Sequence, residues 1–105
     1  MRGQALASDR ERGNCILCHV LPSPEERHYG NLGPSLKGVG RRLSEGQLRL
    51  RLIDSRRLNP DTIMPSYFGI EGLVRVATPY RGKPVLTADD IEDLVAYLQT
   101  LTGPP

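Results

Sequence analysis

Both cysteines of the chain lie in the five-residue stretch Cys15-Ile16-Leu17-Cys18-His19, and this stretch limits the possible folds more than any other feature. Two thiols and an imidazole so close together can form part of a zinc site, a redox dithiol or an attachment point for a cofactor. A disulfide between Cys15 and Cys18 would close too small a loop to stabilise the fold much. The rest of the sequence must therefore contain the further residues that the correct alternative needs.

Each alternative makes a different demand on the sequence. A zinc site needs further ligands, for which the chain offers His28 or a carboxylate but no second cysteine pair. A redox dithiol normally opens a helix after a strand, whereas the residues before Cys15 are polar and favour a helix. Cys-x-x-Cys-His is also the attachment signature of c-type haem. There, Cys15 and Cys18 form thioethers with the porphyrin edge, and His19 lies under the ring as an iron ligand.

Haem attachment requires a second axial ligand, and Met64 is the candidate. It is the only internal methionine, because the other one is Met1. It precedes Pro65, which favours extended backbone at Met64 rather than a helix. Packing in the core is the ordinary alternative role for this side chain. Coordination by His19 and Met64 would raise the reduction potential and leave the iron no open position for oxygen chemistry.

The loop after the cysteines contains residues that can support such a site. Gly33 and Pro34 predict a tight turn, and the Pro34 carbonyl can accept a hydrogen bond from the second imidazole nitrogen of His19. Arg41 or Arg42 can meet a haem propionate through a charge-assisted hydrogen bond, and we expect Arg41 to do so. Ordinary surface charge is the alternative for both arginines.

A haem would also compensate for a lean core. Hydrophobic residues make up 38% of the 105 residues, with one Phe and no Trp, while Gly and Pro contribute 11 and 9 residues. We expect a single domain over residues 1–105, in which a flat apolar cofactor replaces aromatic side chains. The apolar residues expected to line it are Leu17, Leu36, Val39, Leu52, Ile63 and Leu98.

The periodicity predicts an all-α fold with few helices and long loops. We expect a polar helix over residues 4–18, a loop over 19–43 and a helix over 44–54. Ser44 and Gln47 form a capping box for this helix, although alternating leucines there also fit a strand. The clearest element is a terminal helix that begins after Thr87, with Asp90 at its third position. Its apolar positions follow helical spacing: Ile91, Leu94, Val95, Leu98 and Leu101.

Composition and pattern exclude several functions. The net charge of +2 is too small to argue for nucleic-acid binding, and no apolar run is long enough for a membrane span. Residues 1–14 lack the apolar core of a secretory signal, so an exported protein would be present here in a mature or trimmed form. No nucleophile–base pair or catalytic carboxylate pair is visible. The arginines between residues 41 and 57 are a candidate surface for steering an acidic partner.

The ordered set of Cys15-x-x-Cys18-His19, Gly33-Pro34, Met64-Pro65 and an amphipathic terminal helix resembles the class I monohaem cytochromes c. A closer resemblance, to the SoxX-type cytochromes, rests on three stretches: DRERGNCILCHVLP, GPSLKGVGRRLSEGQLRLRLIDSRRLNPDTIMPSYF and EGLVRVATPYRGKPVLTADDIEDLVAYLQTL. Residues 65–86, between Met64 and the terminal helix, distinguish this type from a minimal electron carrier. The resemblance maps the thioethers onto Cys15 and Cys18 and the iron ligands onto His19 and Met64.

The resemblance also implies a biological role. SoxX-type chains carry one covalent haem c and form the small subunit of the periplasmic SoxAX complex, an L-cysteine S-thiosulfotransferase of thiosulfate oxidation. Their SoxA partner joins thiosulfate to a cysteine of the SoxYZ carrier. The SoxX-type haem accepts the released electrons and passes them to a further cytochrome, without catalysis of its own. The alternative is a free-standing, diffusible cytochrome c, and residues 66–80 are our candidate for an apolar partner surface that would separate the two.

Overall fold

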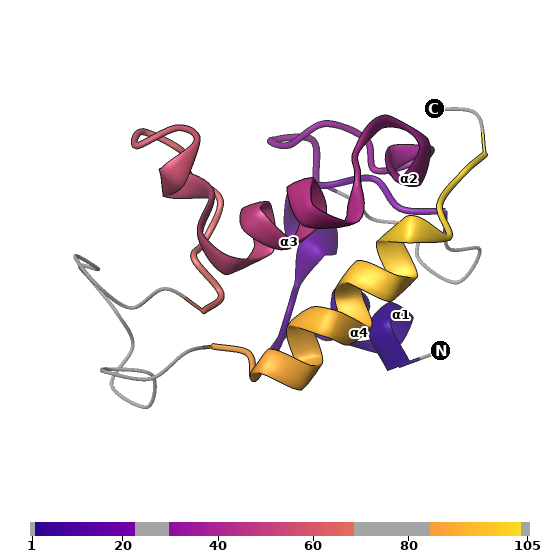
Figure 1. Cartoon of the computed structure of the whole chain (residues 1–105), viewed down its shortest axis with the longest axis horizontal. Coiled ribbons are helices and arrows are strands. Elements are labelled where there is room, and N and C mark those ends of the chain that lie inside the picture. Colours follow the sequence, from indigo (N-terminus) through magenta and orange to yellow (C-terminus); the bar gives the residue numbers. More distant parts are fainter. Residues whose placement is uncertain (1, 23–29, 69–84, 104–105) are drawn as a thin grey trace.

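A computed structural model describes residues 2–22, 30–68 and 85–103 of the chain (Figure 1). Their elements, in chain order, are α1 (Arg2–Ser8), the 3₁₀ turn η1 (Cys15–Leu17), α2 (Val39–Arg42), α3 (Glu45–Asp54), the 3₁₀ turn η2 (Ser55–Arg57) and α4 (Ala88–Gln99). These three ranges contain no strand, which agrees with the predicted all-α class. None of their helices is long and apolar enough to cross a membrane.

The two helices with capping boxes form where the sequence predicts them. Ser44 accepts a hydrogen bond from the Gln47 backbone at the start of α3, and the Gln47 side chain accepts one from Ser44 N–H. Thr87 and Asp90 make the same reciprocal pair at the start of α4. Each pair satisfies backbone donors that the first helical turn cannot satisfy internally. The alternative of a strand over 48–52 is therefore wrong.

The predicted helix over residues 4–18 is wrong in its second half. Helix α1 ends at Ser8, and the chain then turns, with both Asp9 N–H and Gly13 N–H donating to the Leu6 carbonyl. Asn14 has a φ of 49°, in the left-handed region, which a continuing helix cannot contain. The predicted loop over 19–43 also includes the short helix α2 at its end.

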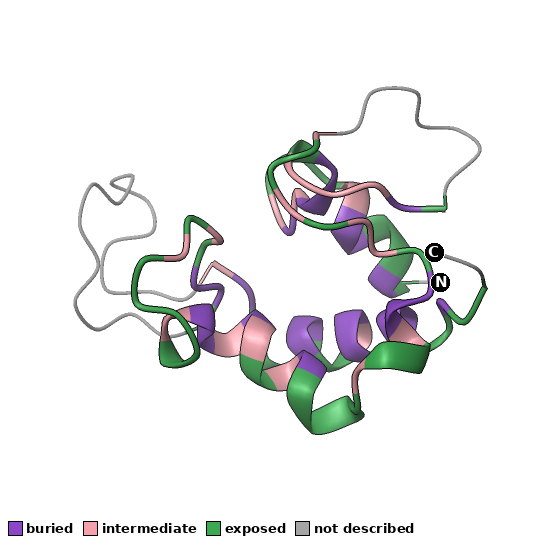
Figure 2. Cartoon of the chain, turned by 90° about the horizontal axis from the view of Figure 1, so that it is seen from above, coloured by how far each residue is buried: buried purple, intermediate pink, exposed green. Residues whose placement is uncertain are grey.

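Helix α4 is the centre of the core, since α1, α2 and α3 all pack against it (Figure 1). Figure 2 shows the buried residues on the sides of the helices that face one another. Four of the five apolar positions predicted for the terminal helix lie in α4, the fifth lies two residues after its end, and all are buried. The core residues are Leu6, Ala7, Cys15, Ile16, Leu21, Val39, Leu48, Leu52, Tyr67, Leu86, Ile91, Leu94, Val95, Tyr97, Leu98 and Leu101.

The contact between α1 and α4 is closest at Gly3. A Cβ atom at this position would lie 2.1 Å from the Asp93 carbonyl oxygen and 2.6 Å from Tyr97 Cβ. Only the absence of a side chain lets the two backbones approach so closely. The chain thereby brings the helix that leads into the cysteine segment against the terminal helix.

Asp90 adds an electrostatic link at the same contact. Its carboxylate is 1% exposed and forms ion pairs with Arg2 of α1 and with Arg12 in the following turn. Burial by itself would raise the pKa of this carboxyl group, but hydrogen bonds from Thr87 and Arg2, with the charge of Arg12, outweigh burial and lower the pKa. The ionised form of Asp90 therefore stabilises the fold.

Two glycine-to-alanine substitutions should have opposite effects on stability. Gly3→Ala should lower the free energy of unfolding by about 1–3 kcal/mol, because the new methyl group overlaps Asp93 and Tyr97. At Gly46, in the first turn of α3, a Cβ atom would point into open space, with no neighbouring group within 4 Å. Gly46→Ala should raise the free energy of unfolding by about 0.5–1 kcal/mol. Denaturant titration of both variants measures these changes. Equal effects of the two substitutions would contradict the close approach of α1 and α4 at Gly3.

Asp90 should also give the stability a specific pH dependence. The pKa of Asp90 is lower in the folded chain than in the unfolded one. Its contribution to the free energy of unfolding is therefore complete above the unfolded pKa of about 3.9 and is lost as pH falls through the folded pKa. Asp90→Asn should lower stability at pH 7 by about 1–3 kcal/mol and reduce this acid sensitivity. The matched control is Asp89→Asn, which removes an exposed carboxylate in the same helical turn. It should change stability by less than about 0.5 kcal/mol.

Candidate haem-binding site

The cysteine segment forms one tight turn that presents both thiols and the imidazole. The left-handed Asn14 sets the entry into η1, and Leu17 N–H donates to the Asn14 carbonyl over 3.1 Å. His19 N–H then donates to the Cys15 carbonyl over 2.9 Å. Cys15 is buried and Cys18 half-buried, and both are free thiols rather than a disulfide. This turn leaves both sulfur atoms available for covalent attachment.

The environment of Cys15 does not favour a redox dithiol. Burial raises the pKa of its thiol to about 11, whereas reactive cysteines have a lowered pKa. Within the described ranges, no group of three or more His, Cys, Asp or Glu side chains is arranged to hold a metal ion. His28, the other histidine that the zinc hypothesis relied on, lies outside the described residues.

His19 is oriented by the loop that the sequence analysis singled out. Its Nδ1 atom lies 2.6 Å from the Pro34 carbonyl oxygen. Because a carbonyl can only accept, Nδ1 must carry the proton, and Nε2 of the neutral ring keeps its lone pair for a metal. Gly33 makes room for the ring, since a Cβ atom there would lie 2.3 Å from His19 Cε1. The loop is anchored in turn by Gly33 N–H, which donates to the Cys18 carbonyl over 2.8 Å.

The two candidate arginines of this loop have different surroundings. The Arg42 guanidinium donates to the backbone carbonyls of Lys37 and Ser35, over 2.8 and 3.0 Å, and so holds the loop that follows Pro34. Arg41 is exposed, and no hydrogen bond or ion pair joins its guanidinium to the described residues. The assignment of Arg41 to a propionate, in preference to Arg42, therefore stays a prediction.

The segment that carries Met64 is docked on the C-terminal end of α3. Ser66 Oγ donates to the Ile53 carbonyl over 3.0 Å, and Tyr67 N–H donates to the Leu52 carbonyl over 3.3 Å. Met64 is half-buried and packs against the core. These hydrogen bonds hold the segment that follows Met64 on α3.

Tyr67 connects this segment to the cysteine segment, and sequence reasoning missed it. Its buried hydroxyl donates to the Gly13 carbonyl, two residues before Cys15. Burial, followed by the nearby sulfur atoms of Cys15 and Cys18, raises the pKa of Tyr67 above its usual value, so the hydroxyl keeps its proton. The only signal in the sequence was an aromatic residue shortly after Met64-Pro65.

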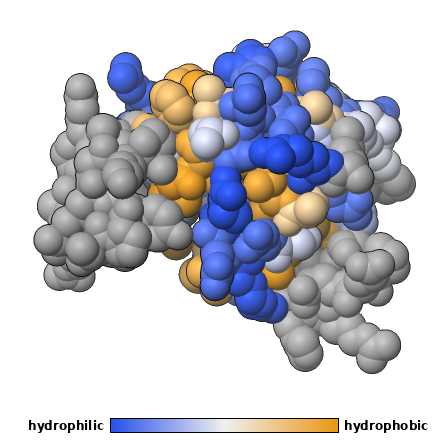
Figure 3. All heavy atoms as spheres, turned by 90° about the horizontal axis from the view of Figure 1, so that it is seen from below, coloured by the Kyte–Doolittle hydropathy of each residue, from blue (hydrophilic) through white to orange (hydrophobic). Residues whose placement is uncertain are grey.

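Apolar side chains next to the candidate ligands are exposed to solvent. Leu17 precedes Cys18, Leu32 precedes Gly33 and Ile63 precedes Met64, and their exposed fractions are 60%, 70% and 72%. Large apolar side chains this exposed, next in sequence to candidate ligands, are suited to contact an apolar cofactor or a partner chain. The face of the molecule drawn in Figure 3 shows apolar surface between hydrophilic side chains. A haem fits this site, because attachment sulfurs, an oriented imidazole, a thioether and apolar side chains are all present.

The predicted lining residues divide into two groups. Val39, Leu52 and Leu98 are buried in the core and Leu36 packs against it, whereas Leu17 and Ile63 are exposed. The buried Oδ1 atom of Asn14, directly before Cys15, has no hydrogen-bond partner among the described residues.

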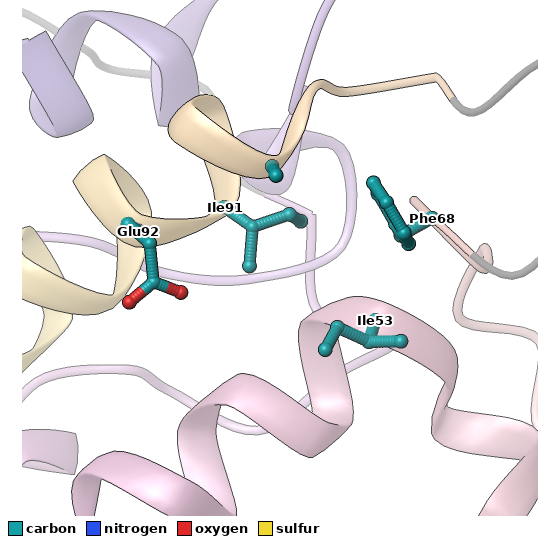
Figure 4. Close-up of a pocket in the computed structure, with 5 residues that line it drawn as sticks. Ile53, Phe68, Ile91 and Glu92 are labelled. Atoms are coloured by element: carbon teal, nitrogen blue, oxygen red, sulfur yellow. The ribbon is translucent and has the colours of Figure 1, made fainter.

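A separate small hollow lies between α3 and α4 (Figure 4). It measures about 70 Å³ and is lined by Ile53, Phe68, Ala88, Ile91 and Glu92. None of the candidate ligands lines it. Most of residues 66–80, the predicted partner surface, lies outside the described residues, and of this surface only Ser66, Tyr67 and Phe68 are placed, the first two of them buried.

Three comparisons with known proteins bear on this site. The model of the cytochrome c family matches residues 1–102. A chain in the crystal structure of SoxXA from P. pantotrophus is similar with a TM-score of 0.86 and 33% sequence identity, over 96% of this chain and 80% of that one. An uncharacterised lipoprotein of Aquifex aeolicus (strain VF5) is 32% identical over 98 residues, which are 90% of this chain and 39% of that protein. The chain thus spans about two fifths of the length of this curated relative.

Proposed function

Since this chain belongs to the cytochrome c family, we propose that it binds one covalent haem c through Cys15 and Cys18, with His19 and Met64 as the axial iron ligands. The predicted class I cytochrome c fold and the resemblance to SoxX-type cytochromes are both confirmed by the comparisons. Electron transfer is the role of the family. The bound haem supplies a reversible one-electron couple at its iron.

The contact between His19 Nδ1 and the Pro34 carbonyl carries this proposal. It fixes the tautomer and the orientation of a ring whose Nε2 atom is then free to bind a metal. Gly33 leaves room for this ring position. The hydrogen bonds that hold the Met64 segment on α3 are a second, separate support for the proposal.

We further propose that the chain is the electron-transfer subunit of a SoxAX-like complex in the periplasm, and that it serves the coupling of thiosulfate to a carrier-protein cysteine. The similarity to a chain of a SoxXA structure supports a cytochrome partner. The exposed Leu32, which is not among the residues expected to line the haem, supports it as well, because an exposed apolar side chain suits a lasting interface better than a brief charged encounter. In this role the chain accepts electrons from the partner and passes them to a downstream cytochrome, and it breaks no substrate bond itself.

The arginines near α3 fit a lasting interface better than a charge-steered encounter, because several of them are paired within the chain. Arg49 forms ion pairs with Glu45 and Glu92, over 2.6 and 2.7 Å. Arg56 forms one with Asp54 over 2.6 Å. Arg51 and Arg42 donate to backbone carbonyls. These arginines therefore serve the fold of their own chain, which weakens the hypothesis that they form a surface for steering an acidic partner.

Replacement of Met64 tests the ligand set. Met64→Ala should abolish the far-red sulfur-to-iron absorption band of the oxidised protein and lower its reduction potential, because a thioether ligand favours the reduced iron. The covalent attachment of haem should persist in denaturing acidic solvent, since it depends on Cys15 and Cys18. An unchanged far-red band would contradict the assignment of Met64, and haem extracted from the chain would contradict the thioethers.

Co-purification tests the partner. Tagged holoprotein from thiosulfate-grown cells should bring down a second, haem-bearing chain. Leu32→Asp should weaken this association by about tenfold or more, because it places a charge on the proposed interface. Leu50→Asp, on the outer side of α3, is the matched control and should leave it unchanged. A wild-type protein that stays monomeric under these conditions would instead identify a free-standing electron carrier.

A further inference from the structure

Ser55 lies where α3 passes into η2, and its hydroxyl group faces the sulfur of Met64. The Oγ atom is 3.4 Å from Met64 Sδ and 2.8 Å from the Arg51 carbonyl oxygen. Ser55 is buried, with 7% of its surface exposed. The contact with the carbonyl one turn back along α3 fixes the side-chain rotamer, so the hydroxyl is held in place beside the sulfur.

Met64 is held at its other end as well. Its backbone N–H donates to Thr62 Oγ1 over 3.2 Å. The thioether sulfur has two lone pairs, and a hydroxyl donor can use one of them while the other remains available to a metal. The geometry therefore defines both the position of the sulfur and the direction from which Ser55 approaches it.

We propose that Ser55 is a positioning residue for the Met64 ligand and that its hydroxyl raises the reduction potential of the haem iron. This inference rests on the proposed role of Met64 as an axial ligand. A hydroxyl that donates to the sulfur withdraws electron density from it, which makes the sulfur a weaker donor to iron. A weaker donor destabilises the oxidised iron, which carries more charge, relative to the reduced iron.

The hydroxyl has a single proton and two acceptors, which limits the size of the effect. In the oxidised protein the sulfur shares its electrons with the iron and accepts poorly, so the Arg51 carbonyl competes well for the proton. In the reduced protein the sulfur accepts better. The hydrogen bond thus strengthens with reduction, and removal of the hydroxyl should shift the equilibrium toward the oxidised form.

Ser66 provides a matched control in the same region. It is also a buried serine, and its hydroxyl donates to the Ile53 carbonyl of α3 over 3.0 Å. Ser66→Ala removes a hydroxyl and a contact with α3, as Ser55→Ala does. Ser55→Ala removes the hydroxyl whose oxygen lies 3.4 Å from Met64 Sδ.

The experiment compares the holoproteins of Ser55→Ala, Ser66→Ala, Met64→Ala and the wild type by spectroelectrochemical titration. Ser55→Ala should keep the far-red sulfur-to-iron band but shift its position, and its equilibrium constant for reduction should fall by about two- to tenfold, the range of one ordinary hydrogen bond. Ser66→Ala loosens the segment without removing the donor to the sulfur, so it should keep the band and change the potential much less than Ser55→Ala, while it destabilises the fold by a similar amount in denaturant titration.

A measurement on the unmodified protein avoids any dependence on variant folding. In the reduced, diamagnetic protein, the protons next to the Met64 sulfur should show nuclear Overhauser effects to the β-protons of Ser55. Their absence, an unchanged potential in Ser55→Ala, or an equal shift in Ser66→Ala would overturn the inference. A far-red band that survives Met64→Ala would instead overturn the ligand assignment itself, so the two failures can be distinguished.

Discussion

One buried side chain, Tyr67, joins the parts of the structure that form the site. Its hydroxyl donates to the Gly13 carbonyl, at the start of the cysteine segment. Its backbone N–H donates to the Leu52 carbonyl of α3, and its own carbonyl accepts from Leu86 N–H, just before α4. Three segments that are distant in sequence thus meet at one residue. Without this junction, the Met64 segment would be tied to α3 but not to the turn that carries His19.

The features that sequence predicted best are those with local causes. The capping boxes at Ser44 and Thr87 involve residues three positions apart, so their pattern is visible in the chain itself. The pairing of Pro34 with His19 was predictable for a different reason, because a histidine that binds a metal needs a partner for its second nitrogen. The helix predicted over residues 4–18 was wrong because the turn at Gly13 and Asn14 depends on contacts with the Leu6 and Asp9 carbonyls.

The residues that sequence reasoning missed act through tertiary contacts. Nothing in the local sequence distinguishes Ser55 from Ser66, and only the fold brings the first against the Met64 sulfur and the second against a helix carbonyl. The arginine-rich stretch suggested a charged surface for a partner, and this stays a prediction. The fold shows that Arg49 and Arg56 are paired with carboxylates of the same chain. The sequence pattern shows which kinds of contact a residue can make, but not which group it contacts in the fold.

The proposed ligands share one structural property that suits electron transfer. His19 is held at its backbone by the Cys15 carbonyl and at its ring by the Pro34 carbonyl. Met64 is held at its backbone by Thr62 and at its sulfur by Ser55. Both side chains are therefore held by contacts within the protein. Ligands held in this way need to move little when an electron arrives or leaves, which favours a reversible one-electron step.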